Sequence, residues 1–257
     1  RLMLGRSWPN PRAWLFFLRR IFASLLGGVS LALLLGCAPS FHNNDGQVVG
    51  LSTSLPLLWR EGGDIRGELS GQVAPHWVLS VLEQDGQVLP LDTLSGASGE
   101  LGLPQKGLLV LAQPRPLMPE ENVALDNWVR GGGRLLLFAD PMLTATSDLP
   151  LGDPRGPQWV AMLSPILTRW GIGFNFDPAQ NEGEREVEIA GAAVPVNLAG
   201  RFAIGDGSNC TLYAEGIAVS CKIGNGRVLA IADAAVLDGE GAVREAALRA
   251  LLQRLRL

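Results

Sequence analysis

Most polar residues that could do chemistry in this chain follow short apolar runs typical of buried strands. The run at 47–51 is followed by three hydroxyl residues, and the run at 107–112 by a glutamine and an arginine. Two further runs end in aspartates. In open α/β sheets, ligands bind beyond the carboxyl ends of the parallel strands. The candidate ligand-binding residues are therefore Ser52, Thr53, Ser54, Gln113, Arg115, Asp140, Asp153, Arg155 and Asp233.

Two interpretations of the acidic members stay open. If Asp140, Asp153 and Asp233 converge within about 6 Å, they form a carboxylate site, because crowded carboxylates titrate abnormally and suit catalysis or metal binding. Alternatively, Asp140 and Asp233 cap the turns after their strands, and residues 152–155 form an ordered loop with an internal ion pair. Separately hydrogen-bonded carboxylates would favour this second interpretation.

The familiar sequence patterns of catalytic and cofactor sites are absent from the chain. It has no Gly-x-Cys-x-Gly or Gly-x-Ser-x-Gly elbow and no Gly-x-x-x-x-Gly-Lys phosphate loop. Its two histidines, His42 and His76, have no second ligand at metal spacing. We therefore expect no catalytic residue of these types, no metal and no cofactor.

The stretch from 103 to 141 indicates the fold class. Residues 107–112 form a continuous apolar run that is too short for a helix and typical of a strand buried on both faces. Pro119 suits the first turn of a helix, and the three glycines at 131–133 end that helix. A second apolar run at 134–139 completes a right-handed βαβ unit.

The rest of the chain extends this unit to about five parallel strands. The stretches GRVLAIAD at 226–233 and GRLLLFAD at 133–140 share one pattern, Gly-Arg followed by four apolar residues and Ala-Asp. We interpret both as central parallel strands. Residues of about 174–225 alternate or form short runs, which favours antiparallel strands. The predicted class is α/β, an open mostly parallel flavodoxin-like or amidotransferase-like sandwich with an antiparallel insertion before the last parallel strand. Residues 158–170 are predicted as a helix, although Pro165 costs a turn or marks a break.

The amino-terminal 37 residues resemble an export signal. They hold five arginines and no acid, and sixteen uncharged residues at 21–36 precede Cys37. A helix of that length rises about 24 Å, short of the roughly 30 Å hydrocarbon core. A secretory signal with a lipobox-like end, lipidated at Cys37, therefore fits better than a membrane span. An uncleaved anchor helix is the alternative.

These features divide the chain into three parts and give it an expected location. We expect a signal or anchor at 1–37, a tether at 38–46 and a single α/β domain at 47–257. Without the first 37 residues the chain has 16 basic and 25 acidic residues, a net charge of −9. Such a body repels phosphate backbones, so no nucleic acid partner is expected. The expected location is the bacterial cell envelope, with the domain anchored to the membrane and facing the periplasm.

The two remaining cysteines bracket a predicted hairpin. If Glu215 and Gly216 form its turn, stepping outward puts Cys210 opposite Cys221. Directly opposed residues lie about 4.5–5.5 Å apart at Cα, which is within disulfide range. A disulfide is therefore geometrically allowed, with two buried free thiols as the alternative.

The central sequence, LLVLAQPRPLMPEENVALDNWVRGGGRLLLFADP, resembles the auxiliary domain of ABC transport systems, including gliding-motility auxiliary (GldG-like) proteins of the class I glutamine-amidotransferase-like superfamily. The matching features are a strand ending near Pro114, the helix start at 119–121, the glycines and arginine at 132–134, and Asp140-Pro141. The resemblance implies an extracytoplasmic, membrane-attached, non-enzymatic module that works with an ABC permease, an ATPase or another envelope protein.

Two functions are consistent with these observations. The first is a non-enzymatic, membrane-tethered binding or interaction module, accessory to an ABC-type transporter or another envelope complex. The second is a hydrolase or amidotransferase relative with a carboxylate site at the carboxyl ends of the parallel strands.

Overall fold

The computed structural model of the chain describes residues 47–58, 75–150 and 152–256. All of them belong to the compact unit that spans Asn44–Leu257. The predicted signal or anchor at 1–37, the lipidation site Cys37 and the tether at 38–46 lie outside the described residues.

A seven-stranded sheet forms the centre of this unit, in the order β2-β1-β3-β4-β11-β10-β9. The first five strands are mutually parallel, and β10 and β9 continue the sheet in antiparallel pairing. The coarse prediction of a mixed α/β fold with a mostly parallel central sheet is therefore confirmed. The strands are β1 (Val48–Thr53), β2 (Gln87–Pro90), β3 (Leu108–Ala112), β4 (Arg134–Phe138), β9 (Cys210–Tyr213), β10 (Ala218–Ile223) and β11 (Gly226–Ile231).

The three innermost parallel strands are apolar because both of their faces are covered. Every residue of β3 is buried. In β4 and β11, every residue from the third position onward is buried. The two similar sequences at 133–140 and 226–233 lie side by side, with Arg134 paired to Arg227 and Phe138 to Ile231. Their shared pattern therefore reflects a shared position in the middle of the sheet.

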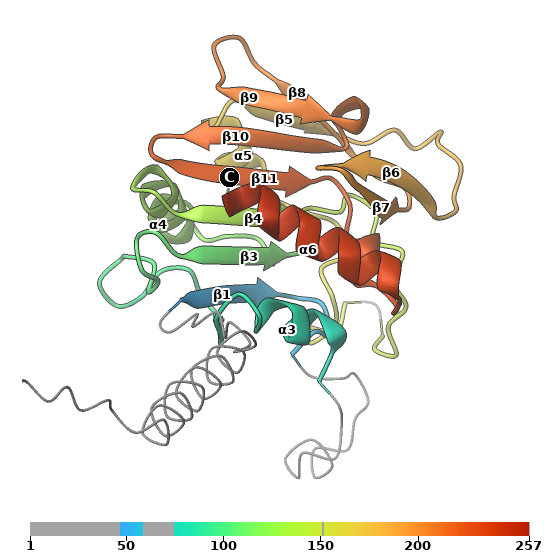
Figure 1. Ribbon diagram of the computed structural model, residues 1–257, viewed down its shortest axis with the longest axis horizontal. Helices are drawn as coiled ribbons and strands as arrows, with labels where there is room; N and C mark the ends of the chain where they lie inside the picture. The colour runs from blue at the N-terminus through green and yellow to red at the C-terminus, as the bar shows by residue number, and fades with distance from the viewer. Residues whose placement is uncertain (1–46, 59–74, 151, 257) are drawn as a thin grey trace, which may run out of the picture. The chain divides into compact units, whose positions relative to one another are not determined.

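Helices cover the two faces of the sheet and complete two separate cores. On one face, α3 (Trp77–Leu82) and α6 (Ala242–Arg256) bury their apolar stripes against the sheet. On the other face, α4 (Pro119–Arg130) and α5 (Ser164–Arg169) do the same. Figure 1 shows α6 crossing in front of the central strands. The βαβ unit at 103–141 thus consists of β3, α4 and β4.

The insertion between β4 and β11 is antiparallel. In it, β5 (Ile172–Asn175) pairs with β8 (Arg201–Ile204), and β6 (Arg185–Ile189) pairs with β7 (Ala192–Val196). The β9–β10 hairpin follows and joins the main sheet. Side chains of β7 enter the core beneath α6, whereas Ile172 and Phe202 enter the core beneath α4 and α5. The insertion therefore extends both cores.

The helix predicted at 158–170 is wrong over its first half. The helix α5 begins only at Ser164, with Pro165 in its first turn. Proline has no N–H to donate and clashes with a preceding helical turn, so it starts this helix. Residues 158–163 are instead irregular, and both the backbone N–H and the carbonyl of Gln158 bond to residues at the strand ends.

A buried carboxylate joins the two helices on this second face. Asp126 of α4 accepts hydrogen bonds from Arg130 at 2.9 Å, from Arg169 at 2.7 Å and from the Trp170 indole at 2.9 Å. Burial alone would raise the pKa of Asp126, but these hydrogen bonds hold it below its usual range. The ion pairs therefore fix α5 against α4 and set where the insertion begins.

The β9–β10 hairpin places Cys210 directly opposite Cys221, and a disulfide joins them with a Cα–Cα distance of 4.1 Å. A short 3-10 turn, Ala214–Gly216, lies at the tip of the hairpin, and Glu215 in it has a positive φ of 54°. The pairing of Tyr213 with Ala218 keeps the register that the sequence predicts.

We expect Cys210→Ala/Cys221→Ala to lower the melting temperature by several degrees without changing the fold. The reason is that the closed loop is short, and its loss returns about 3 kcal/mol of chain entropy to the unfolded state. Thermal unfolding followed by circular dichroism measures the effect. Reduction of the wild-type protein should reproduce it, and equal melting temperatures of the variant and the oxidised wild type would contradict the prediction.

Candidate functional site

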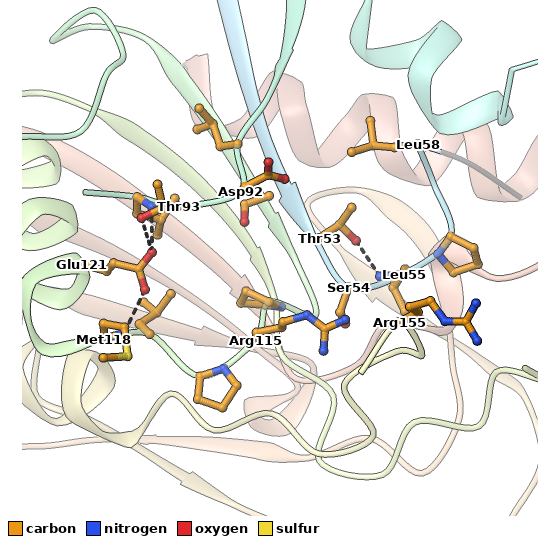
Figure 2. Close-up of a pocket in the computed structure, with 17 residues that line it drawn as sticks. Thr53, Ser54, Leu55, Leu58, Asp92, Thr93, Arg115, Met118, Glu121 and Arg155 are labelled. Carbon is orange, nitrogen blue, oxygen red and sulfur yellow. Dashed lines mark hydrogen bonds between the residues drawn. The ribbon is translucent and has the colours of Figure 1, made fainter. Parts of the chain in front are cut away.

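A hollow lies at the carboxyl ends of β1, β2 and β3. Its volume is about 570 Å³. Three successive loops and the first turn of α4 form its walls, and the loop at 152–157 adds one side chain (Figure 2). The lining residues are Ser52, Thr53, Ser54, Leu55, Pro56, Leu58, Leu91, Asp92, Thr93, Leu94, Pro114, Arg115, Pro116, Leu117, Met118, Glu121 and Arg155.

The hydroxyl residues after β1 have two different roles. Thr53 donates to the carbonyl of Ala112 at 2.8 Å and accepts from the N–H of Leu55 at 2.9 Å. Ser54 donates to the carbonyl of Gln113 at 2.5 Å and accepts from the N–H of Gln158 at 2.8 Å. These two hydroxyls hold the loop in place. Among the described residues, Ser52 has no such bond, so its hydroxyl is available to a ligand.

Glu121 closes the pocket at the start of α4. Its carboxylate accepts hydrogen bonds from the Thr93 hydroxyl at 2.8 Å and from the N–H groups of Leu94 at 2.9 Å and Met118 at 2.8 Å. Burial would raise its pKa, but the hydrogen bonds to the charged form outweigh it and lower the pKa. Glu121 is therefore a fixed anion that joins the loop after β2 to α4 and holds no proton to give.

The two arginines of the pocket differ in how their charge is balanced. Arg155 forms an ion pair with Asp153, with 2.7 Å between Nη2 and Oδ2, and its side chain is 75% exposed. The side-chain hydrogen bonds from Arg155 lower the pKa of Asp153 to about 2. Arg115 instead donates only to the carbonyl of Gly156, at 3.1 Å. Within the described ranges no carboxylate pairs with Arg115.

Asp92 supplies the negative counterpart of Arg115. It follows β2, lines the pocket, is exposed, and has no hydrogen-bond or ion-pair partner in the part of the chain that the structure describes. In Figure 2, Asp92 and Glu121 lie toward one side of the pocket, and Arg115 and Arg155 toward the other. The pocket is therefore polarised, with one unpaired charge of each sign.

Gln113, predicted as a ligand residue, is a structural clamp instead. It is fully buried, and its φ of 48° places it in the left-handed region. Its side-chain oxygen accepts from the N–H of Asp140 at 2.8 Å. Its amide donates to the carbonyls of Asp140 at 2.9 Å and Gln158 at 2.7 Å. The amide is thus fully occupied by backbone groups and cannot serve a ligand.

Asp140 and Asp233 follow the neighbouring strands β4 and β11 and are each 1% exposed. Asp140 accepts from the N–H groups of Met142 and Ala234 at 2.8 and 3.1 Å. Asp233 accepts from those of Ala235 and Asn197 at 2.6 and 2.8 Å. Neither lines the pocket described above.

Burial and mutual repulsion shift the protonation of this aspartate pair. Burial raises the pKa of Asp140 to about 6, although two N–H bonds favour its charged form. Burial, and next the charge of Asp140, raise the pKa of Asp233. Asp153 takes no part, since it pairs with Arg155 and its pKa is lowered. The bonds of Asp140 and Asp233 to backbone N–H groups and the ion pair of Asp153 with Arg155 therefore fit the second of the two interpretations, in which the pair caps the turns after its strands.

The sequence reasoning found five of the residues that line the pocket and missed its two acids. Ser52, Thr53, Ser54, Arg115 and Arg155 are brought together as expected. Asp92 follows β2, whose end is not among the strand ends from which the candidates were taken. Glu121 lies in the first turn of α4, so a search limited to strand ends does not find it. In the described residues, no group of three histidine, cysteine or acidic side chains could hold a metal ion.

Comparison with known proteins gives only distant structural neighbours. No family model and no curated protein sequence matches the chain. The exo-β-1,4-mannosidase Op5Man5 from Opitutaceae bacterium strain TAV5 is 14% identical with a TM-score of 0.46, covering 90% of this chain and 38% of its own. The GH42 β-galactosidase Gan42B from G. stearothermophilus is 14% identical with a TM-score of 0.45, covering 81% and 29%. The chain thus spans about a third of these glycosidases.

A third neighbour is described as the cytoplasmic protein STM1381 from Salmonella typhimurium LT2. It is 12% identical with a TM-score of 0.43, and the match covers 81% of this chain and 99% of STM1381. At TM-scores below 0.5, these likenesses transfer neither an activity nor a location to this chain.

The comparisons do not bear out several of the sequence-based predictions. The resemblance to ABC-transport auxiliary (GldG-like) domains is not supported, because no family model matches the chain and the solved structures found are described as other proteins. The predicted non-enzymatic, membrane-tethered role, with its lipoprotein and transporter associations, is likewise not supported by any of the comparisons.

The predicted membrane-anchored periplasmic location is not supported by any of the comparisons either. Among residues 47–58, 75–150 and 152–256, no helix has the length and apolar character needed to cross a bilayer.

We expect the buried aspartate pair to make the protein less stable as the pH rises from about 5 to 7. Between the ordinary pKa of 3.8 and the folded-state pKa of about 6, the unfolded chain releases a proton that folded Asp140 keeps. Each such group costs up to about 1.4 kcal/mol per pH unit in this window, and Asp233 acts in the same direction.

Denaturant unfolding at pH 5, 6 and 7 measures this slope. Asp233→Asn should flatten it, whatever that change does to the absolute free energy of unfolding. Asp126→Asn is the control. Because the pKa of Asp126 is lowered, its titration changes the free energy of unfolding only in more acidic solution. A free energy that stays constant or rises between pH 5 and 7 would contradict the prediction.

Proposed function

We propose that this domain is a hydrolase relative with a flavodoxin-like arrangement and that its working site is the pocket at the carboxyl ends of β1, β2 and β3. The strand order β2-β1-β3-β4-β11 supports the arrangement, since it is the 2-1-3-4-5 order of doubly wound sheets. In such sheets, ligands bind beyond the carboxyl ends near the point where the strand order reverses, which here is β1 and β3. We assign residues 47–257 to this single domain, with its insertion at about 174–225.

The observation that carries the proposal is the unpaired carboxylate of Asp92 inside a polar pocket. An exposed carboxylate with no partner can accept a proton from a water molecule. As the water oxygen bonds to the electrophilic carbon of the substrate, Asp92 takes its proton, and the departing group leaves with that proton when its bond breaks. The guanidinium of Arg115 lies in the same pocket and can stabilise negative charge on the substrate.

The other carboxylates of the described residues suit this role less well. Glu121 accepts three hydrogen bonds and has a lowered pKa. Asp140 and Asp233 have raised pKa values, as catalytic acids do, but they are buried and bonded to backbone N–H groups outside the pocket. Asp153 is neutralised by Arg155. Asp92 is therefore the carboxylate that a substrate and a water can reach together.

We expect Asp92→Asn to lower kcat/KM for hydrolysis about 100-fold or more, because a general base contributes about 10² to 10⁴ in rate. A panel of p-nitrophenyl glycosides and esters, followed by nitrophenolate release, measures the activity. Glu100→Gln is the matched control, since Glu100 is an exposed carboxylate outside the pocket.

Two results would contradict the proposal. A wild-type protein that hydrolyses no member of the panel would remove the hydrolase assignment. Equal activity in the wild type, Asp92→Asn and Glu100→Gln would leave hydrolysis but remove Asp92 as its base.

A further inference from the structure

The charges of the strand-end pocket point to the class of molecule that it takes. We infer that the ligand is a small organic acid carrying hydroxyl groups, with its carboxylate or phosphate bound by Arg115 and its hydroxyl groups directed toward Asp92 and Ser52. This inference rests on the proposed function, because it concerns the same pocket.

Arg115 is the residue that can bind the acid group of the ligand, because no carboxylate among the described residues pairs with its charge. Its one hydrogen bond, from Nη2 to the carbonyl of Gly156 at 3.1 Å, orients the guanidinium without neutralising it. The remaining N–H groups match a carboxylate or a phosphate, which bind a guanidinium through two parallel hydrogen bonds. Arg155 is a weaker candidate, since Asp153 already accepts both its Nε and its Nη2 groups.

The loop that carries Gly156 is itself well held, so Arg115 is oriented by a fixed partner. The N–H of Gly156 donates to the carbonyl of Asp153 at 3.0 Å, and the nearby Gln158 is tied to Ser54 and Gln113. An arginine oriented before binding loses less side-chain freedom when the ligand arrives.

The opposite end of the pocket selects for hydrogen-bond donors. The carboxylate of Asp92 accepts hydrogen bonds and repels a second acid group, so an anion is favoured only near Arg115. The Ser52 hydroxyl can donate or accept. Leucine and proline side chains line much of the remaining wall and suit the carbon skeleton of the ligand. A molecule with one acid group and several hydroxyl groups satisfies all of these groups together.

The test compares the binding of D-glucose, D-glucuronate and D-glucose 6-phosphate by isothermal titration calorimetry at low salt. The three probes share a sugar ring and differ in the acid group. We expect at least one acid to bind about tenfold or more tightly than glucose, and the tighter acid identifies which group Arg115 receives. Equal binding of all three, or no binding of any, would overturn the inference.

Variants separate the role of Arg115 from a general effect of charge. Arg115→Gln should abolish the preference for the acid, and Arg115→Lys should retain part of it, because lysine keeps the charge but loses the fork of donors. Arg227→Gln, which removes an equal charge from an exposed site outside the pocket, should leave it unchanged. Circular dichroism checks that each variant is folded. An unchanged preference in Arg115→Gln would overturn the assignment.

D-Glucose and D-glucuronate contain no glycosidic or ester bond, so their binding is measured without turnover, whereas for D-glucose 6-phosphate the release of inorganic phosphate is measured alongside. Failure of acid binding with active hydrolysis would therefore remove only the substrate class. Acid binding without hydrolysis would support the substrate class while the hydrolase proposal fails.

Discussion

The hydrogen bonds of the Gln113 side chain hold together the carboxyl ends of three neighbouring parallel strands. Strands that end inside a protein leave backbone N–H and carbonyl groups that water cannot reach, and each needs a partner. The Gln113 amide serves the N–H and the carbonyl of Asp140 after β4, together with the carbonyl of Gln158. Its own carbonyl accepts from Ser54 after β1. A positive φ at a residue that is not glycine is unfavourable, so this network must sustain it.

This clamp divides the strand ends into a closed half and an open half. Around β4 and β11, the side chains of Asp140, Asp233 and Gln113 are taken up by hydrogen bonds to backbone groups. Around β1, β2 and β3, the loops enclose the pocket. Among the described residues, the side chains of Ser52 and Asp92 have no protein partner there, and Arg115 bonds to one backbone carbonyl but to no carboxylate. Ser54 belongs to the clamp and also lies in the pocket wall. The hydrogen bonds of the clamp therefore also hold this part of the pocket wall in place.

The sequence predicts this fold well where local patterns decide the structure. The apolar runs at 107–112, 134–139 and 226–231 can only be buried strands, and the hairpin register follows from counting outward from its turn. Prediction fails where the deciding contacts are distant in sequence. Gln113 bonds to residues 27 and 45 positions away and Ser54 to one 104 positions away, and nothing near either residue reveals these partners. The break of the helix at Pro165 was visible in the sequence but not its exact position.

The aspartates at the strand ends show why residue type alone did not locate the site. All four of Asp92, Asp140, Asp153 and Asp233 follow or lie close to the end of a parallel strand, yet their surroundings give them different chemistry. Burial raises the pKa of Asp140 and Asp233 and places them in backbone turns. The neighbouring arginine lowers that of Asp153 and neutralises its charge. Of these four, Asp92 alone has an exposed carboxylate without a partner among the described residues, and it follows β2, the edge strand of the described sheet.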